Sequence, residues 1–587
     1  MTTGQQSSRT SGVTAELERD VAAWIDQDPD PATVAAAHDL LTAARSGEQD
    51  AVAELTDAFG GRLQFGTAGL RGALGPGPRR MNRVVVGQAA AGLARYLLDQ
   101  GRAGGRVIIG YDARYNSDVF ARDTAEILAA AGFDALLAEA PLPTPVVAFG
   151  IRHVTCVAGV VVTASHNPAR DNGYKVYLGD GSQIVPPADA EIARCIIEVT
   201  RGRLDHVPRS SAFTVLGTDL VAAYLDRVVT LVPAEAPRDI AWAYTAMHGV
   251  GAAVVAAAVQ RIGLPTPSAV PEQLHPDPDF PTLAFPNPEE PGAMDMVLAV
   301  AARDGVDVVV ANDPDADRCA VAVPVVVPTS ETGGESAGEP GRDPGPQSWQ
   351  VLRGDELGAL LADDLLRRGV EGTYACSIVS SSLLATMAAA HGQPFVATLT
   401  GFKWIGRVPG LAFGYEEAIG YCVDPSAVPD KDGISALVRV LALAAALKAD
   451  GLTLTDRLDE ITRTYGVHAT DQLSVRVSDL SVITDAMTRL RAEPPQMLLG
   501  EPVRVIDLAV GSDDLPPTDG IRLLGESVTV VVRPSGTEPK LKCYLESRIP
   551  AADSQDVTLA RAEAQRRLDQ VRAEITRALG LDRPSES

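Results

Sequence analysis

Three aspartates at alternate positions, Asp313, Asp315 and Asp317, form the pattern with the most defined chemistry in this chain. Carboxylates this close on one short loop can converge on a single cation, and hard oxygen ligands suit Mg²⁺. A solvated acidic turn is the alternative, whereas an EF-hand is excluded because its glycine and glutamate do not follow. The loop leaves a valine-rich run at 306–310 and carries Arg318, which could hold a ligand or an oxyanion. These two features favour a metal site.

A serine in an earlier loop, Thr163-Ala-Ser-His-Asn-Pro168, is the candidate nucleophile. The loop follows a short apolar run at 157–162, which predicts a buried strand. Open α/β sheets place their chemistry at the carboxyl ends of such strands, so Ser165 and His166 are expected there. A simple turn hydroxyl is the alternative, because adjacent residues on a loop rarely face each other.

A loop near the carboxyl terminus, Arg533-Pro-Ser-Gly-Thr537, has the composition of an anion-binding nest. Arg533 can bind a phosphate through two nitrogens, Ser535 and Thr537 supply hydroxyls, and Gly536 lets backbone amides approach. A hairpin turn with incidental polar residues explains the spacing equally well.

Glycine-containing loops elsewhere hold further carboxylates and cations. Glu416 and Glu417 follow an apolar run, where a carboxylate can accept hydrogen bonds from sugar hydroxyls. Single lysines stand in three other glycine-flanked loops, at Lys175, Lys403 and Lys431. Each is by default a solvated surface group, but a serine, a metal loop, cations and carboxylates together predict phosphoryl transfer.

The composition narrows the classes of partner. The 587 residues carry a net charge of −25, which argues against nucleic acids and anionic membranes. Six cysteines without a Cys-x-x-Cys pair predict reduced, buried thiols and a cytoplasmic protein. From the Ser/Thr-rich start, which lacks an apolar core, we expect no signal peptide, and no apolar run is long enough to predict a membrane span.

The elements that position these loops alternate between helix and strand. We expect an α/β fold with three similar mixed α/β domains, a C-terminal α+β domain around a central cleft, and a helical N-terminal extension. The expected boundaries are 1–60 for the tail and extension, 61–213 for domain 1, 214–327 for domain 2, 328–348 for a low-complexity insert, 349–466 for domain 3 and 467–587 for domain 4. A long amphipathic helix over 557–579 is expected to close the chain.

The chain resembles the α-D-phosphohexomutase superfamily, the group of phosphoglucomutases and phosphomannomutases. The resemblance rests on four motifs in the family's order: Thr163-Ala-Ser-His-Asn-Pro168, Asp313-Pro-Asp-Ala-Asp-Arg318, Gly414-Tyr-Glu-Glu-Ala-Ile-Gly420 and Arg533-Pro-Ser-Gly-Thr537. The N-terminal helices and the loop Phe65-Gly-Thr-Ala-Gly-Leu-Arg-Gly72 are most similar to the branch of phosphopentomutases and glucose-1,6-bisphosphate synthases.

The resemblance implies a role for each motif. Ser165 would carry the phosphoryl group and, with Asp313, Asp315 and Asp317, hold one Mg²⁺ per chain. The residues around the transferring group would be Arg71, His166 and Lys175, with Lys175 a candidate general base. The residues that contact the sugar or its distal phosphate would be Arg318, Lys403, Glu416, Lys431, Arg533, Ser535, Gly536 and Thr537. One departure is Ala418, where the hexose enzymes often have a serine that contacts the sugar.

The predicted activity is that of a phosphosugar mutase, an isomerase acting on an aldose phosphate such as glucose 1-phosphate through a phosphoserine and a sugar bisphosphate. The alternatives are phosphomannomutase or phosphopentomutase specificity, a sugar-1,6-bisphosphate synthase, a serine phosphatase and a non-catalytic sugar-phosphate sensor. The sensor is disfavoured because Ser165 and all three aspartates are retained. The expected partners are sugar phosphates, and the expected state is a monomer or homodimer.

Overall fold

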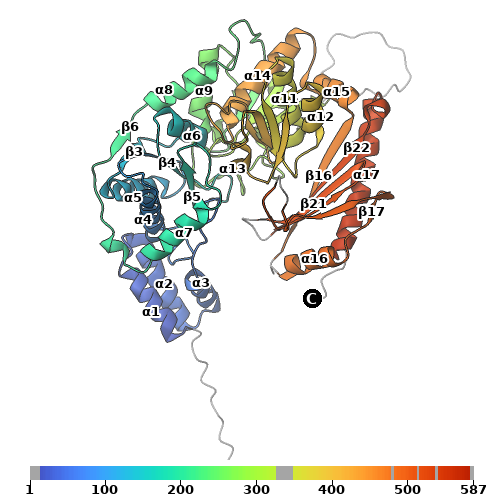
Figure 1. The fold of residues 1–587 in the computed structure, drawn as a ribbon. Helices are drawn as coiled ribbons and strands as arrows, with labels where there is room; N and C mark the ends of the chain where they lie inside the picture. Colours follow the sequence, from blue (N-terminus) through green and yellow to red (C-terminus); the bar gives the residue numbers. More distant parts are fainter. Residues whose placement is uncertain (1–12, 326–347, 478–480, 512–514, 536–539, 582–587) are drawn as a thin grey trace, which may run out of the picture.

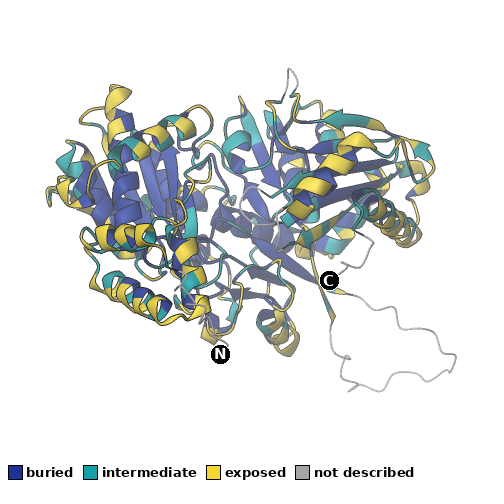
Figure 2. Ribbon diagram, turned by 90° about the horizontal axis from the view of Figure 1, so that it is seen from below, coloured by how far each residue is buried: buried dark blue, intermediate teal, exposed yellow. Residues whose placement is uncertain are grey.

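The structure is a computed structural model that describes residues 13–325, 348–477, 481–511, 515–535 and 540–581. Three short helices and four sheet-containing domains follow one another along an arc (Figure 1). In each domain the strands form a buried interior, while exposed residues concentrate on the outer faces of the helices (Figure 2). The predicted fold class is confirmed.

The N-terminal extension is a bundle of three helices, α1 (Ala15–Ile25), α2 (Pro31–Ser46) and α3 (Gln49–Phe59). Its small core gathers apolar side chains such as Val21, Leu41 and Leu55. Helix α2 begins at Pro31, because Asp30 caps the first turn and proline is favoured at the first helical position.

Domain 1 contains a mixed six-stranded sheet in the order β1-β5-β4-β2-β3-β6. Its strands are β1 (Leu70–Ala73), β2 (Arg106–Tyr111), β3 (Asp134–Ala138), β4 (Ala158–Val162), β5 (Asp171–Leu178) and β6 (Thr214–Leu216). Its helices are α4 (Arg83–Asp99), α5 (Ser117–Ala130), α6 (Thr144–His153) and α7 (Ala188–Val199). Helices cover both faces, so β4 is buried along its whole length, as its uninterrupted apolar sequence predicts.

Domain 2 contains a five-stranded sheet in the order β11-β10-β9-β7-β8. Its strands are β7 (Trp242–Thr245), β8 (Ser268–Ala269), β9 (Val308–Ala311), β10 (Ala320–Val325) and β11 (Ser348–Val351), and its helices are α8 (Asp219–Val229), α9 (Gly251–Ile262) and α10 (Asp295–Asp304). Strand β10 returns antiparallel to β9, so the aspartate loop is the connection between two paired strands.

Domain 3 contains a four-stranded sheet in the order β13-β12-β14-β15. Its strands are β12 (Thr373–Ser377), β13 (Phe395–Thr398), β14 (Leu411–Glu416) and β15 (Gly420–Cys422). Its helices are α11 (Gly354–Arg367), α12 (Leu383–Ala390), α13 (Phe402–Ile405), α14 (Gly433–Ala449) and α15 (Leu454–Tyr465). One continuous apolar cluster joins side chains of domains 1, 2 and 3, including Val147, Trp242 and Leu437.

Domain 4 has a different architecture from the first three, as the expected C-terminal α+β domain requires. Its antiparallel sheet runs β16-β22-β21-β20-β19. The strands are β16 (Val467–Arg476), β19 (Arg504–Asp507), β20 (Ile521–Leu524), β21 (Val528–Pro534) and β22 (Lys540–Ile549), with a small pair β17 (Met497–Leu498) and β18 (Glu501–Pro502). Helices α16 (Ser481–Ala492) and α17 (Val557–Leu579) pack on this domain, which has a separate apolar core.

Two strands cross the domain boundaries expected from the sequence. Strand β6 pairs with β3 of domain 1, although its residues were expected to open domain 2. Strand β11 pairs with β10 of domain 2, although residues 349–351 were expected in domain 3. Both runs are short, so the sequence alone could not show which sheet supplies their hydrogen bonds. Of the expected insert at 328–348, residues 328–347 lie outside the described residues, and Ser348 is the first residue of β11.

Two expectations from composition can be compared with the structure. All six cysteines are unpaired and buried, as predicted. Among the described residues, no helix is long and apolar enough to cross a membrane.

Candidate active site

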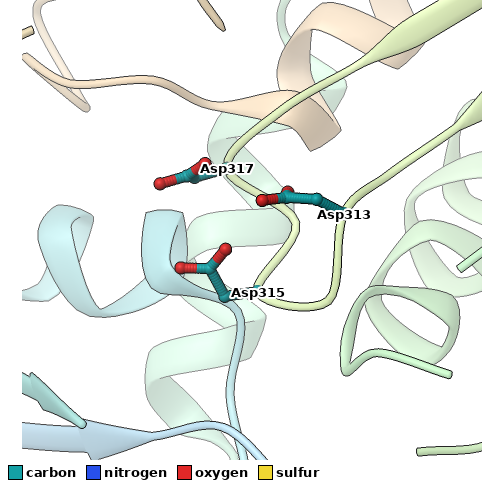
Figure 3. A group of neighbouring side chains, drawn as sticks. All are labelled: Asp313, Asp315 and Asp317. Atoms are coloured by element: carbon teal, nitrogen blue, oxygen red, sulfur yellow. The ribbon is translucent and has the colours of Figure 1, made fainter. Parts of the chain in front are cut away.

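The aspartate loop lies buried between β9 and β10, with the three carboxylates converging on one point (Figure 3). One ligand oxygen from each of Asp313, Asp315 and Asp317 lies within 4.8 Å of the others. A close approach from domain 2 fixes the turn, because Val250 N donates to Pro314 O at 2.8 Å. A side chain on Gly249 would collide with the Pro314 backbone, so only glycine fits there.

Domain 1 holds the same loop from the other side. Thr144, at the start of α6, donates its hydroxyl to Asp315 Oδ2 at 2.7 Å and its backbone N–H to Asp315 O at 2.9 Å. Arg318 N donates to Asp313 Oδ1 at 3.0 Å. The carboxylates are therefore oriented by hydrogen bonds from two domains before any cation is considered.

The residues present fit a divalent cation. In the described part of the chain, Asp315 Oδ1 and Asp317 Oδ1 are buried and accept no hydrogen bond. Buried carboxylate oxygens without a donor are costly unless they ligate a cation. Burial, together with the neighbouring carboxylates, raises the pKa of Asp313 well above its usual range. A bound cation would relieve this repulsion and keep Asp313 ionised.

Ser165 faces the aspartate loop across the boundary between domains 1 and 2. Its Oγ donates to Asp313 Oδ2 at 2.6 Å and lies 3.1 Å from Nδ1 of His166. The residue adopts a left-handed backbone conformation, with φ of +52°. A serine held in this uncommon conformation beside three carboxylates is not a solvated turn residue, which was the alternative from the sequence.

His166 and Arg71 complete the surroundings of the serine. Burial and the guanidinium groups of Arg318 and Arg71 hold the pKa of His166 well below its usual value, so the ring is neutral. Arg71 donates to Asn167 Oδ1 at 3.0 Å, which fixes it beside the serine loop. The site therefore combines a hydroxyl, a neutral imidazole and a cationic guanidinium.

Lys175 extends from β5 between two of the aspartates. Its Nζ lies 2.7 Å from Asp315 Oδ2 and 2.9 Å from Asp317 Oδ2. Burial alone would lower the pKa of Lys175, but these two carboxylates outweigh it and raise the pKa. Lys175 is thus an ammonium ion in this arrangement, which suits charge neutralisation; its action as a general base stays a prediction.

The residues expected to bind the sugar approach from domain 3. Lys431 Nζ lies 3.5 Å from Asp317 Oδ2 and 4.0 Å from Glu416 Oε1, so these two residues join the aspartate cluster. Glu417 points elsewhere, because its Oε2 accepts hydrogen bonds from Ser377 at 2.9 Å and Ser380 at 3.2 Å. Only Glu416 of the adjacent pair therefore lies beside the cations of the site.

Lys403 links domain 3 to the glycine-rich loop of domain 1, because Nζ donates to Thr67 Oγ1 at 2.5 Å. Burial and the nearby Arg533 guanidinium both lower the pKa of Lys403. Arg533, at the end of β21, is therefore near enough for its charge to act on Lys403 across the boundary between domains 3 and 4. Ser535 N donates to Lys540 O at 2.8 Å; Gly536 and Thr537 lie outside the described residues.

The structure adds site residues that the sequence did not reveal. Thr144 and Thr67 contact Asp315 and Lys403 directly, and Glu289 forms an ion pair with Arg318 at 3.2 Å. The local sequence does not show these contacts, because each partner is more than 25 residues away. Only the tertiary fold could identify them.

Comparison with known proteins now decides the family. Four domain families match in order: phosphoglucomutase/phosphomannomutase α/β/α domains I, II and III at residues 62–202, 222–325 and 353–465, and the C-terminal domain at 472–575. A probable phosphomannomutase of Haemophilus influenzae is 47% identical over 474 residues, covering 80% of this chain and 93% of that protein. The chain belongs to the phosphoglucomutase/phosphomannomutase family. It is an isomerase of the intramolecular phosphotransferase type.

Other members of the family are named for different sugars. Human phosphopentomutase is 34% identical over 603 residues, covering 92% of this chain and 93% of that protein. The crystal structure of a putative phosphomannomutase from Thermus thermophilus is 25% identical with a TM-score of 0.64, and it covers 86% of this chain and 99% of that one. Family membership thus establishes the reaction class but does not select the sugar.

Proposed function

We propose that this protein is a phosphosugar mutase that moves a phosphoryl group between the 1-position and the terminal hydroxyl of an aldose phosphate. Glucose 1-phosphate and glucose 6-phosphate are the proposed substrate pair. The observation that carries the proposal is the hydrogen bond of 2.6 Å between Ser165 Oγ and Asp313 Oδ2. It joins the candidate nucleophile of one domain to the candidate metal loop of another.

In the proposed reaction, phosphorylated Ser165 donates its phosphoryl group to a hydroxyl of the sugar monophosphate. The P–O bond to serine breaks and a P–O bond to the sugar forms; the proton that the sugar hydroxyl loses is balanced by the one that the released Ser165 Oγ gains. The resulting bisphosphate turns over and returns its other phosphoryl group to Ser165. Catalysis of this kind depends mainly on positioning and charge stabilisation.

The chain supplies both requirements. Asp313, Asp315 and Asp317, with an oxygen of phosphorylated Ser165, would hold one Mg²⁺, which when bound neutralises phosphate charge. Arg71 and Lys175 place further positive charge beside the serine. Neutral His166 lies 3.1 Å from Ser165 Oγ, close enough to exchange a proton with it.

The far end of the substrate meets residues of domains 3 and 4. Lys403 and Arg533 are the proposed ligands of the distal phosphate, with Ser535 and, from the sequence alone, Gly536 and Thr537. Glu416 and Lys431 are the proposed contacts of the sugar hydroxyls, and Arg318, which follows the aspartate loop, is a further proposed substrate contact. A bisphosphate must bind in both directions, so this end must recognise phosphate strongly and the sugar ring loosely.

A pentose phosphate is the second candidate substrate. A relative named phosphopentomutase aligns over 92% of this chain, and Ala418 removes a side-chain hydroxyl that hexose enzymes often use. The two candidate substrates can be told apart by which aldose 1-phosphate, a hexose or a pentose, the enzyme converts fastest.

The test compares glucose, mannose, ribose and deoxyribose 1-phosphates in one preparation, with the matching bisphosphate and Mg²⁺ present. We expect turnover that disappears in Ser165→Ala while the folded structure is retained. Mutase activity that survives in Ser165→Ala would refute the phosphoserine mechanism.

A further inference from the structure

A buried arginine that is not among the proposed catalytic residues holds the serine loop by hydrogen bonds. Arg114 lies between β2 and α5, and only 4% of its surface is exposed. Its Nη2 donates to Ser165 O at 2.7 Å and Asn167 O at 2.5 Å, and its Nη1 donates to Pro168 O at 2.8 Å and Asp171 O at 3.1 Å. One guanidinium thus satisfies four backbone carbonyls of the loop that carries Ser165.

These four contacts matter because the other hydrogen bonds of the loop, such as Ser165 N to Thr163 Oγ1 at 2.8 Å and Arg71 to Asn167 Oδ1 at 3.0 Å, leave the Ser165 carbonyl without a donor. Ser165 is held at φ of +52°, a conformation that costs an L-residue roughly 1–2 kcal/mol. Its carbonyl is turned towards Arg114, away from the sheet hydrogen bonds that order β4. Without a donor that carbonyl would be buried and unsatisfied, so the backbone would relax away from this conformation. A shift of the backbone would move Oγ away from Asp313.

Arg114 is itself fixed from two domains. In domain 1, Asp112 lies 3.4 Å from Arg114 Nε and accepts the Arg114 N–H at 3.1 Å. In domain 2, the ring of Phe280 stacks on the guanidinium, with 4.8 Å between Cζ and the ring centroid. Next to this stack, Tyr115 of domain 1 donates to Asp279 Oδ1 of domain 2 at 2.9 Å. The residues that hold the serine loop in place therefore include part of domain 2, the domain that supplies the aspartates.

We propose that Arg114 is a positioning residue for phosphoryl transfer. Its four hydrogen bonds fix the backbone conformation of Ser165, and the stacking of Phe280 on its guanidinium links this conformation to domain 2. The proposal rests on the proposed function, in which Ser165 carries the phosphoryl group. Arg114 touches neither substrate nor reacting atoms and acts through the serine loop alone.

The planar guanidinium is the feature that the geometry requires. Two terminal nitrogens, each donating to two carbonyls, reach four acceptors at fixed angles. A lysine ammonium has the same charge but only one nitrogen and three donors, so it cannot reproduce the fork. Arg114→Lys therefore separates the effect of geometry from that of charge.

The experiment measures single-turnover transfer from phosphorylated full-length enzyme to glucose 1-phosphate in Arg114→Lys and Arg114→Gln. A rate constant for one turnover does not depend on the fraction of active molecules, so a loss caused only by misfolding would leave it unchanged. Misplacing a reacting group by about 1 Å costs on the order of 100-fold. We expect a rate constant roughly 100-fold below wild type, with substrate dissociation constants unchanged because the sugar and distal phosphate contacts lie in other domains.

Two further variants complete the test. Arg122→Gln removes an exposed arginine of α5 that stacks on Phe213 at 5.7 Å, and it should transfer at the wild-type rate. Phe280→Leu keeps all four hydrogen bonds but removes the stack, and it should slow transfer less than Arg114→Lys does. If both Arg114 variants failed to fold, a wild-type rate in Phe280→Leu would overturn the proposal.

The outcomes also separate this inference from the proposed function. Wild-type protein that cannot be phosphorylated on Ser165 would refute the proposed function. Wild-type protein that transfers, together with Arg114→Lys transferring at the same rate, would refute only the role of Arg114. A parallel rise of the substrate dissociation constant with no change of the transfer rate would also overturn it.

Discussion

One of the contacts between domains 3 and 4 is made by a buried carboxylate, Glu546 of β22. Its Oε1 accepts the Ser381 hydroxyl at 2.9 Å and the Ser382 N–H at 2.7 Å, at the start of α12. Its Oε2 accepts from Arg548 at 2.9 Å, and His468 of β16 lies 3.5 Å from Oε1. Because domain 4 also carries Arg533, this attachment positions the proposed phosphate contact over the site.

The pKa of Glu546 gives the size of the effect. Burial acts against ionisation, but the hydrogen bond and charge of His468, with Arg548, lower the pKa from 4.5 to about 2. That difference corresponds to about 3 kcal/mol in favour of the folded form with Glu546 ionised, and it comes mainly from His468 and Arg548 within domain 4, with a smaller part from Ser382 of domain 3. A lowered pKa in the folded state stabilises above the unfolded pKa, so the contribution is complete above pH 4.5 and is lost as the pH falls through about 2.

We therefore expect Glu546→Gln to lower the free energy of unfolding of domain 4 by about 3 kcal/mol at pH 7 and to loosen its contact with Ser381 and Ser382 of domain 3. Hydrogen exchange of the β16 and β22 amides should accelerate in the variant at pH 7, and the Michaelis constant should rise. The difference from wild type should shrink steadily below pH 4.5. Glu526→Gln, which changes an exposed carboxylate of the same domain, is the matched control. Equal exchange rates for Glu546→Gln and wild type at pH 7 would refute the reasoning.

Three shorter predictions concern the site itself. Asp315→Ala should abolish Mg²⁺ binding measured by calorimetry, and full turnover of the wild type in excess chelator would contradict a metal role. Lys175→Met leaves buried Asp315 without its ammonium partner and Asp317 with Lys431 alone, so urea unfolding in metal-free buffer should show a loss of about 3–5 kcal/mol; an unchanged midpoint would argue against the ion pairs. Arg533→Ala removes a charged contact worth about 1.5–3 kcal/mol, so the Michaelis constant should rise roughly 10- to 150-fold while Ser165 remains phosphorylated.

The sequence predicted the architecture well because each polar loop follows a buried strand. The apolar run before Ser165 is β4, and the valine-rich run before Asp313 is β9, which begins at Val308 rather than Val306. The closing helix over 557–579 has the predicted bounds, because its apolar stripe is regular and Asp556 caps it. Local patterns of this kind are visible in sequence since they reflect burial and capping, which depend on neighbouring residues.

Contacts between distant segments could not be predicted in the same way. Thr67 and Lys403 meet although 336 residues separate them; each stands in a glycine-containing loop that the sequence shows, but nothing in either loop indicates the other as its partner. Arg114 is likewise an ordinary loop arginine in sequence, and only the fold shows that its partners are four carbonyls 51 to 57 residues away. Residue type indicates what chemistry a side chain can do, whereas its partner depends on how the sheets pack.

The distribution of charge around the aspartate loop explains why the site needs several domains at once. Three buried carboxylates on one loop repel one another, and that loop supplies only Arg318 to balance them. Lys175 comes from domain 1 and Lys431 from domain 3, each within 3.5 Å of Asp317. These two cations reach the loop only when domains 1, 2 and 3 are packed together, which their shared apolar core achieves. The apolar core shared by the three domains therefore also brings together the positive and negative charges that would surround a phosphoryl group.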